Sequence, residues 1–279
     1  MKIAVFSDIQ ANVPAMEATM AHILDWKPDL VVMNGDLVNR GPLSLPCLDL
    51  MEEAQQTYGW IALRGNHEDF VLECASTTAA TPVEAEMRQF TDWTSQQLGD
   101  RCHKISLWGD HYCLHGQGYP DSWVHITHGT LAGNRYGVLK ETPDHILLER
   151  IPSDLRIFVT SHTHRPLQRQ LGKTHILNVG SAGSPFDGDP RGSYGQLTFH
   201  QGEWHTKIVR FDYDRTQANQ DFFDSGFIDQ GGPIARLLYQ EWYRATGFMP
   251  QWHRTYREAV LSGEISLSKA VDDFILTLD

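Results

Sequence analysis

Two short loops of the chain place polar side chains directly after apolar, strand-like runs. Residues 35–41 carry Asp36, and residues 63–68 carry Asn66 and His67. Glycines flank these side chains and permit tight turns. Because α/β sheets bind ligands at the carboxyl ends of their strands, both loops are predicted to lie at a functional edge of a sheet.

Three further polar groups follow strand-like runs elsewhere in the chain. They are Asp8 with Gln10, the single His128, and the pair His162 and His164. Taken alone, each has an ordinary reading as a helix cap, a turn residue or a histidine at a strand end. The two side chains of a His-x-His segment also point to opposite faces of a strand unless the backbone bends. The repeated pattern nevertheless favours one site assembled from distant parts of the chain.

These side chains offer the donor atoms of a metal centre. Carboxylate, imidazole and amide oxygen ligands suit Mn, Fe, Zn or Ni, and they lack the thiolates of a structural zinc site. An aspartate can bridge two cations, and two metals about 3.5–4 Å apart can hold a hydroxide and clamp a phosphoryl oxygen for in-line attack. We expect two divalent ions, with manganese preferred over iron, zinc, nickel or magnesium.

The composition of the 279-residue chain narrows the functional classes. Its net charge of −12 argues against a nucleic-acid or membrane-surface binder, because such proteins neutralise phosphates with clustered basic residues. A phosphate substrate stays compatible, since bound cations make an acidic site locally positive. No run reaches the roughly 20 apolar residues of a membrane span. Four cysteines without a CxxC pair, and a strand-like N-terminus, lead us to expect a reduced, cytoplasmic protein without a signal peptide.

Strand-like runs recur over the first 211 residues, with helical patterns such as residues 83–98 between the early ones. A strand–helix–strand order implies parallel pairing, whereas the short connections of the late strands favour antiparallel pairing. The sum predicts an α/β sandwich of two mixed sheets. Strands are expected at Lys2–Phe6, Leu30–Asn34, Trp60–Arg64, Tyr112–His115, His125–His128, Ile157–Ser161, His175–Asn178, Gly195–Phe199 and Thr206–Phe211.

Helical patterns dominate the last part of the chain. Helices are expected at residues 234–246, 252–261 and 266–278. The last of them has a continuous apolar stripe, which must be covered by another element. We therefore predict a main domain of residues 1–218 and a helical C-terminal extension of residues 219–279. The extension is expected to pack on that domain or on a partner subunit of a homo-oligomer.

Five short motifs follow one another over about residues 1–165. They are Asp8-x-Gln10, Gly35-Asp36, Gly65-Asn66-His67-Glu68, His128-Gly129 and Ser161-His162-Thr163-His164. Together they resemble the calcineurin-like metallophosphoesterase superfamily. The later segment from Asn178 to Arg191 resembles its bacterial and archaeal phosphodiesterase-like branch. The resemblance implies a four-layer αββα sandwich and hydrolysis of phosphate esters by a metal-bound hydroxide.

The resemblance also implies a role for each motif residue. One metal would be held by Asp8, Asp36 and His164, and the other by Asn66, His128 and His162, with Asp36 bridging. His67 would protonate the leaving oxygen or stabilise its developing charge. Arg40 and Arg191 would contact the phosphate through charge-assisted hydrogen bonds, although ordinary surface ion pairs are the alternative for both.

Two positions need a choice. Family members usually carry histidine where this chain has Gln10, and an amide oxygen is a weaker, neutral ligand. We therefore expect weaker binding at the first metal or a changed metal preference. His115 and His128 both end strand-like runs, and we favour His128 as the ligand because it ends an alternating run before a plausible loop. His115 is then expected near the substrate.

The motifs leave three functions to weigh. The loops at residues 35–41 and 63–68 also match phosphoprotein phosphatases, but the first motif lacks that branch's pattern, and residues 180–184 are phosphodiesterase-like. We expect a phosphodiesterase or phosphatase that acts on a small or nucleotide-like phosphate ester. A serine/threonine protein phosphatase is the second reading. A regulatory or binding protein with a weakened metal site is the third, because of Gln10 and the helical extension. A nuclease has little support, since no basic stripe with interleaved aromatic residues is visible.

Overall fold

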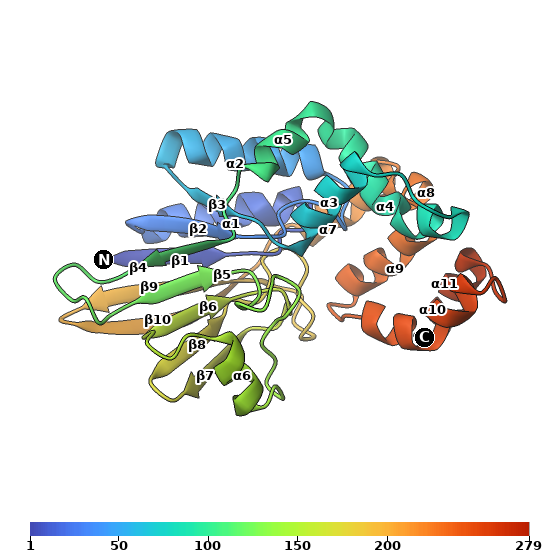
Figure 1. The fold of residues 1–279 in the computed structure, drawn as a ribbon. Coiled ribbons are helices and arrows are strands. Elements are labelled where there is room, and N and C mark those ends of the chain that lie inside the picture. Colours follow the sequence, from blue (N-terminus) through green and yellow to red (C-terminus); the bar gives the residue numbers. More distant parts are fainter. Residues whose placement is uncertain (279) are drawn as a thin grey trace.

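Two five-stranded sheets form the centre of the computed structural model, which describes residues 1–278 (Figure 1). The first sheet contains β1 (Lys2–Phe6), β2 (Leu30–Asn34), β3 (Ile61–Leu63), β9 (Gly192–His200) and β10 (Glu203–Phe211). Their order is β10-β9-β1-β2-β3. The early strands β1, β2 and β3 are parallel, whereas β9 and β10 are antiparallel, which confirms the pairing predicted from the connections.

The second sheet is also mixed. It contains β4 (His111–Leu114), β5 (Val124–Thr127), β6 (Ile157–Thr160), β7 (Leu167–Leu171) and β8 (Thr174–Asn178), in the order β4-β5-β6-β8-β7. Strands β5, β6 and β8 are parallel, and the edge strands β4 and β7 are antiparallel to their neighbours. The sequence patterns do not predict β7, because three polar residues separate its two leucines and only an edge position tolerates them.

Helices cover the outer faces of the two sheets. Helices α1 (Val13–Trp26), α2 (Ser44–Tyr58) and α5 (Cys102–Ser106) lie over the first sheet, and α6 (Asp144–Arg150) lies over the second (Figure 1). Because side chains alternate along a strand, Ile3 and Val5 of β1 pack between the sheets while Phe6 packs under the helices. The α/β class and the four-layer αββα sandwich are therefore confirmed.

The start of α1 ties this helix to a distant loop. Asn12 caps the helix, since its side-chain oxygen accepts a hydrogen bond from the amide of Ala15 at 3.1 Å. The same side chain donates from Nδ2 to the carbonyl of Gly183 at 2.8 Å. One residue thus fixes the helix and the loop after β8 together.

The C-terminal helices pack around a helix from the earlier part of the chain. The remaining helices are α3 (Asn66–Ser76), α4 (Pro82–Leu98), α7 (Arg215–Asp224), α8 (Phe227–Gln230), α9 (Gly232–Tyr243), α10 (Met249–Leu261) and α11 (Leu267–Ile275), with a short 3-10 helix at Gly99–Arg101. Phe90 of α4 is buried in one apolar cluster with Leu238 of α9 and Trp252 of α10. The extension therefore packs on the same chain, and the predicted boundary after residue 218 falls inside α7.

Two further expectations concern membrane-spanning segments and the redox state of the cysteines. Within residues 1–278, no helix is both long and apolar enough to cross a membrane. The four cysteines are free thiols. Three of them are buried, so the apolar interior accounts for their presence.

Candidate active site

The predicted ligands meet at the carboxyl ends of parallel strands. Two groups of side chains have potential ligand atoms within 4.8 Å of one another, and both groups contain Asp36. The first group is Asp8, Asp36 and His164, and the second is Asp36, His128 and His162. This is the two-group arrangement with a shared aspartate that the motifs predict. It arises because each ligand follows a strand whose end lies at the same edge.

The first group contains buried acceptors that have no hydrogen-bond partner. Asp8 is fully buried, and neither of its carboxylate oxygens accepts a hydrogen bond within residues 1–278. Its Oδ1 lies 3.1 Å from Nε2 of His164, and Oε1 of Gln10 is also buried without a donor. Buried acceptors are normally satisfied, because leaving one unpaired costs about 1–3 kcal/mol. A cation at this point would satisfy them, so the residues present fit a metal ion.

The second group is held by hydrogen bonds around it. Oδ1 of Asn66 lies 3.1 Å from Nε2 of His128 and 2.7 Å from Nδ1 of His162. The other nitrogen of His128 lies 2.8 Å from the carbonyl oxygen of Asn34. A backbone partner of this kind fixes the orientation of a ligand imidazole and leaves its other nitrogen facing the centre.

The backbone bends at the ligands themselves. Asp8, Asp36, His162 and His164 have φ angles of 57°, 56°, 65° and 56°, all in the left-handed region. These bends explain how both histidines of the His-x-His segment reach one centre. Non-glycine residues in this region are strained by about 1–3 kcal/mol each, and such strain concentrates at functional sites.

Glu68 joins the two loops that the sequence singles out. Its buried carboxylate accepts hydrogen bonds from the amides of Asp36 (2.7 Å), Leu37 (2.8 Å) and Gly65 (2.8 Å). Gly65 is required as well, because a β-carbon there would overlap the Asp36 carboxylate. The sequence motif alone indicates no role for Glu68. Its place in the first turn of α3, after a glycine, is nevertheless typical of a residue that binds loop amides.

The charged groups at the centre shift one another's pKa values. Burial alone would raise the pKa of Asp36, but the His128 ring 3.3 Å away lowers that pKa well below its usual range. Burial would likewise lower the pKa of His128, but Asp36 raises it to about 10. Burial and the Asp36 carboxylate raise the pKa of Glu68 to about 7, against the backbone amides that it accepts. A cation bound by Asp36 and His128 would displace the proton of His128, because a ligand imidazole is neutral.

His67 stands at the edge of the centre with a defined tautomer. Its amide donates to Oδ1 of Asp36 at 2.9 Å, and its Nδ1 lies 3.1 Å from Nδ2 of Asn39. Oδ1 of Asn39 lies 3.2 Å from the hydroxyl of Thr94, and Nδ2 faces the ring. With the amide in this orientation, Nδ1 of His67 accepts, which assigns the ring proton of the neutral imidazole to Nε2. Burial, together with nearby Arg40, lowers the pKa of His67 well below its usual value, although Asp36 opposes this.

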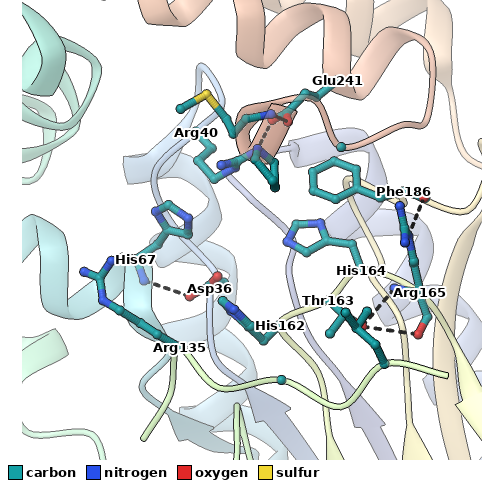
Figure 2. A pocket seen from close by; sticks show the side chains of 15 residues that line it. Asp36, Arg40, His67, Arg135, His162, Thr163, His164, Arg165, Phe186 and Glu241 are labelled. Atoms are coloured by element: carbon teal, nitrogen blue, oxygen red, sulfur yellow. Dashed lines mark hydrogen bonds and ion pairs between the residues drawn. The ribbon is translucent and has the colours of Figure 1, made fainter. Parts of the chain in front are cut away.

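A cavity of about 380 Å³ opens over these residues (Figure 2). Its wall includes three arginines, Arg40, Arg135 and Arg165, of which the last two were not predicted. Phe186 and Met249 give it apolar surface. The remaining lining residues are Asp36, His67, Gly137, Leu139, His162, Thr163, His164, Glu241, Gly247 and Pro250. The C-terminal helices thus form part of the wall.

Comparison with known families shows which family this chain belongs to. A family model described as calcineurin-like phosphoesterase matches residues 1–187, more than half of the chain. The chain belongs to the calcineurin-like phosphoesterase family. That family uses divalent metal ions.

Solved structures share the fold of this phosphoesterase. A metallophosphoesterase from Sphaerobacter thermophilus aligns with a TM-score of 0.68 and 21% identity, over 88% of this chain and 100% of that one. A hypothetical protein from Pyrococcus horikoshii aligns with a TM-score of 0.70 and 12% identity, over 88% and 98% of the two chains. Both aligned proteins are of bacterial or archaeal origin. At such identities the likeness concerns the fold.

A curated relative matches over a short stretch. Serine/threonine-protein phosphatase 1 of Salmonella typhimurium is 44% identical over 57 residues, which are 20% of this chain and 24% of that protein. The phosphoesterase thus spans about a quarter of the length of the relative that it matches.

Arg40 of the phosphoesterase reaches the cavity but is already paired. Its guanidinium forms an ion pair with Glu241 of α9, and the two side chains are 13% and 1% exposed. Oε1 of Glu241 also accepts from the amide of Met249 at 2.6 Å. On its other side Arg40 lies 5.7 Å from the ring of Phe186, which stacks on His164 at 4.1 Å. Glu241 of the C-terminal extension thereby holds Arg40 beside the predicted metal ligands.

Two expected substrate contacts lie outside the cavity. His115 follows β4, which is antiparallel to β5, so it lies at the opposite end of β5 from His128 and packs against Trp123. Arg191 is half exposed, pairs with Asp189 and does not line the cavity. The structure therefore separates both residues from the ligand groups. His128, the residue favoured over His115, lies inside them.

Proposed function

We propose that this phosphoesterase hydrolyses a small phosphate ester with two divalent metal ions. Asp8, Asp36 and His164 would hold the first ion, with Gln10 beside it, and Asn66, His128 and His162 would hold the second, with Asp36 bridging. When bound, such ions polarise phosphoryl oxygens and lower the pKa of a water molecule. Manganese is the ion we propose first, with iron, zinc, nickel or magnesium as alternatives.

One observation carries the proposal. Two groups of ligand-type side chains share Asp36 at the base of a cavity that His67 and Arg40 also line. Buried oxygens of Asp8 and Gln10 that accept no hydrogen bond in the described chain support a cation at the first group. A hydrolytic centre needs this combination of cation ligands, a proton donor and a phosphate-binding cation within one cavity.

The chain's own groups would position the ester and stabilise its departure. His67 carries its ring proton on Nε2, so it would donate a hydrogen bond to the leaving oxygen as the ester bond breaks. Arg40 would orient a phosphoryl oxygen through a charge-assisted hydrogen bond. The cavity wall from the C-terminal helices would exclude bulk water, which strengthens both interactions.

The size of the cavity favours a small substrate. A volume of about 380 Å³ suits a small phosphate ester, and the C-terminal helices close one side against a protein surface. A serine/threonine protein phosphatase is the second candidate, because the short match to the Salmonella typhimurium phosphatase favours it. We place the enzyme in the cytoplasm, in agreement with its four free cysteines.

The test compares substrates with the manganese-loaded full chain. We expect turnover of p-nitrophenyl phosphate or bis-p-nitrophenyl phosphate, and little turnover of a phosphothreonine peptide. His67→Asn should lower kcat in the same assay. Preference for the peptide would replace our proposal with the protein phosphatase. No turnover of any ester with manganese, iron, zinc, nickel or magnesium, together with unchanged metal binding, would leave a binding protein.

A further inference from the structure

Two arginines at the cavity have no acidic partner. The chain has 35 acidic and 23 basic residues, and several of its arginines pair with a carboxylate. Arg64, Arg101 and Arg169, for example, each form an ion pair with an aspartate. Within residues 1–278, Arg135 and Arg165 form none, although both are exposed and line the cavity. Others away from the cavity, such as Arg254 and Arg257, also form no ion pair in the described part of the chain, so the position of Arg135 and Arg165 at the cavity is what distinguishes them. In an acidic protein, two unpaired cations at one cavity point to an anionic ligand.

Arg165 is held ready for such a ligand. It directly follows His164, and its Nε donates to the carbonyl of Phe186 at 3.0 Å. The amide of Phe186 in turn donates to the carbonyl of His164 at 3.0 Å. One edge of the guanidinium is thereby fixed to the ligand loop, while the two terminal nitrogens stay available. A fixed guanidinium with free terminal nitrogens is suited to bidentate binding of a phosphate.

Arg135 lies on an anchored loop in another part of the wall. In the view of Figure 2, Arg135 and Arg165 are drawn at different ends of the cavity, and Arg165 lies beside Phe186. Asn134, the neighbour of Arg135, donates a hydrogen bond to Asp69 of α3. Gly137 packs so closely against Thr163 that a β-carbon would overlap that side chain. The loop is thus fixed on both sides of Arg135, against elements that carry the metal ligands.

Arg40 differs from these two residues in charge balance. Glu241 already neutralises it, so it adds little net positive charge to the cavity. The charge of the phosphate to be hydrolysed would be compensated by the two metal ions, and Arg40 would orient it. The hydrolysed phosphate then does not need the charges of Arg135 and Arg165. These two charges remain for a second anionic group of the substrate.

We propose that the substrate is a nucleotide-like ester that carries a second phosphate, which Arg165 binds while Arg135 adds positive charge from another part of the cavity wall. This inference rests on the proposed function and names its substrate class. Phe186, Leu139, Met249 and Pro250 supply apolar surface for the flat part of such a molecule. In the reaction, a water oxygen bonds to the first phosphorus and the ester P–O bond breaks. The leaving oxygen gains a proton, and the second phosphate stays on the released alcohol.

The test uses two nucleotides that differ by one phosphate. Adenosine 5′-monophosphate and adenosine 3′,5′-bisphosphate are measured as competitive inhibitors of p-nitrophenyl phosphate hydrolysis by the manganese-loaded full chain. We expect the bisphosphate to inhibit at least ~10-fold more tightly, since charge-assisted hydrogen bonds of this kind are worth a factor of about ten or more. Arg165→Gln should remove most of this preference, and Arg135→Gln part of it. The control is Arg257→Gln, an exposed arginine of α10 outside the cavity.

Each outcome decides a different point. Equal inhibition by the two nucleotides, or an Arg165→Gln variant that weakens both equally, overturns the second phosphate and leaves phosphate-ester hydrolysis standing. An equal effect of Arg257→Gln also overturns it, because general charge then explains the preference. If p-nitrophenyl phosphate is not hydrolysed, the proposed function has failed. Calorimetric titration of the metal-loaded protein with the same two nucleotides then tests whether a second phosphate is bound. Equal affinities for the two nucleotides would refute the proposed second-phosphate site.

Discussion

The ion pair between Arg40 and Glu241 gives the sharpest test of how the extension supports the site. Glu241→Ala leaves Arg40 without its carboxylate, although that side chain is only 13% exposed. It also removes the acceptor of two backbone amides, those of Phe248 and Met249. Breaking a buried pair by removing one partner costs about 3–5 kcal/mol, because the other charge stays buried. We therefore expect the free energy of unfolding to fall by about 4 kcal/mol.

Two further variants separate the charge from the shape of this contact. Glu241→Gln keeps an oxygen for the two amides but removes the charge, so we expect a loss of about 2 kcal/mol. Adding Arg40→Met should recover part of that loss, because neither charge then remains buried. A double-mutant cycle measures this recovery as a coupling energy, expected between about 1 and 3 kcal/mol.

The assay is urea unfolding of each variant, followed by circular dichroism. Glu258→Ala is the matched control, since it removes an exposed glutamate of α10 and should change stability by less than about 0.5 kcal/mol. In p-nitrophenyl phosphate assays, Glu241→Gln should also raise KM, because Arg40 loses the group that orients it. A Glu241→Ala variant within about 1 kcal/mol of wild type, or an additive cycle, would refute the reasoning.

Four other changes test the centre and its surroundings. His67→Asn should lower kcat by about 10²–10⁴-fold in ester assays, with metal binding unchanged. Manganese at 100 times its Kd should stabilise the fold by about 2.7 kcal/mol in thermal unfolding, and Asp36→Asn should abolish that gain. Gln10→His should tighten manganese binding in calorimetry, since imidazole is the stronger ligand. Burial, aided by His111, lowers the pKa of His125 to about 4, so its stabilisation is complete above about pH 6.5 and is lost as the pH falls towards 4. His125→Phe should therefore reduce the fall in stability between those pH values.

Contrary results would be informative in each case. Normal kcat in His67→Asn would assign the proton to another group. A manganese gain that survives Asp36→Asn would place the cation elsewhere, and unchanged affinity in Gln10→His would remove Gln10 from the first metal. For His125, a wild-type and a His125→Phe protein that lose stability equally below pH 6.5 would show that other groups dominate acid unfolding.

The sequence predicts those parts of the site that follow strands. Asp8, Asp36 and His128 each stand where a buried strand ends, so the sheet itself brings them to one edge. The choice between His128 and His115 shows the limit of this reasoning. Both follow apolar runs, but β4 is antiparallel to β5, and only pairing in the sheet places one of them at the far edge.

Residues that are placed by tertiary packing cannot be predicted from their position at a strand end. Glu241 lies in the apolar face of α9, and its sequence neighbours do not reveal that Arg40, 201 residues earlier, neutralises it. Arg135 and Arg165 look like ordinary surface arginines until the cavity is seen. The same holds for α4, because its apolar face is covered by helices that follow much later in the chain. Long-range partners of this kind leave no local pattern.

The packing of the C-terminal helices on α4 also sets the order in which the site is assembled during translation. The predicted metal ligands and α4 are synthesised before Glu241 and the helices that cover Phe90. Until those helices are made, Phe90 lacks their cover and Arg40 lacks the counter-charge of Glu241. Translation of α9 and the start of α10 therefore supplies both the ion pair of Arg40 and one part of the cavity wall.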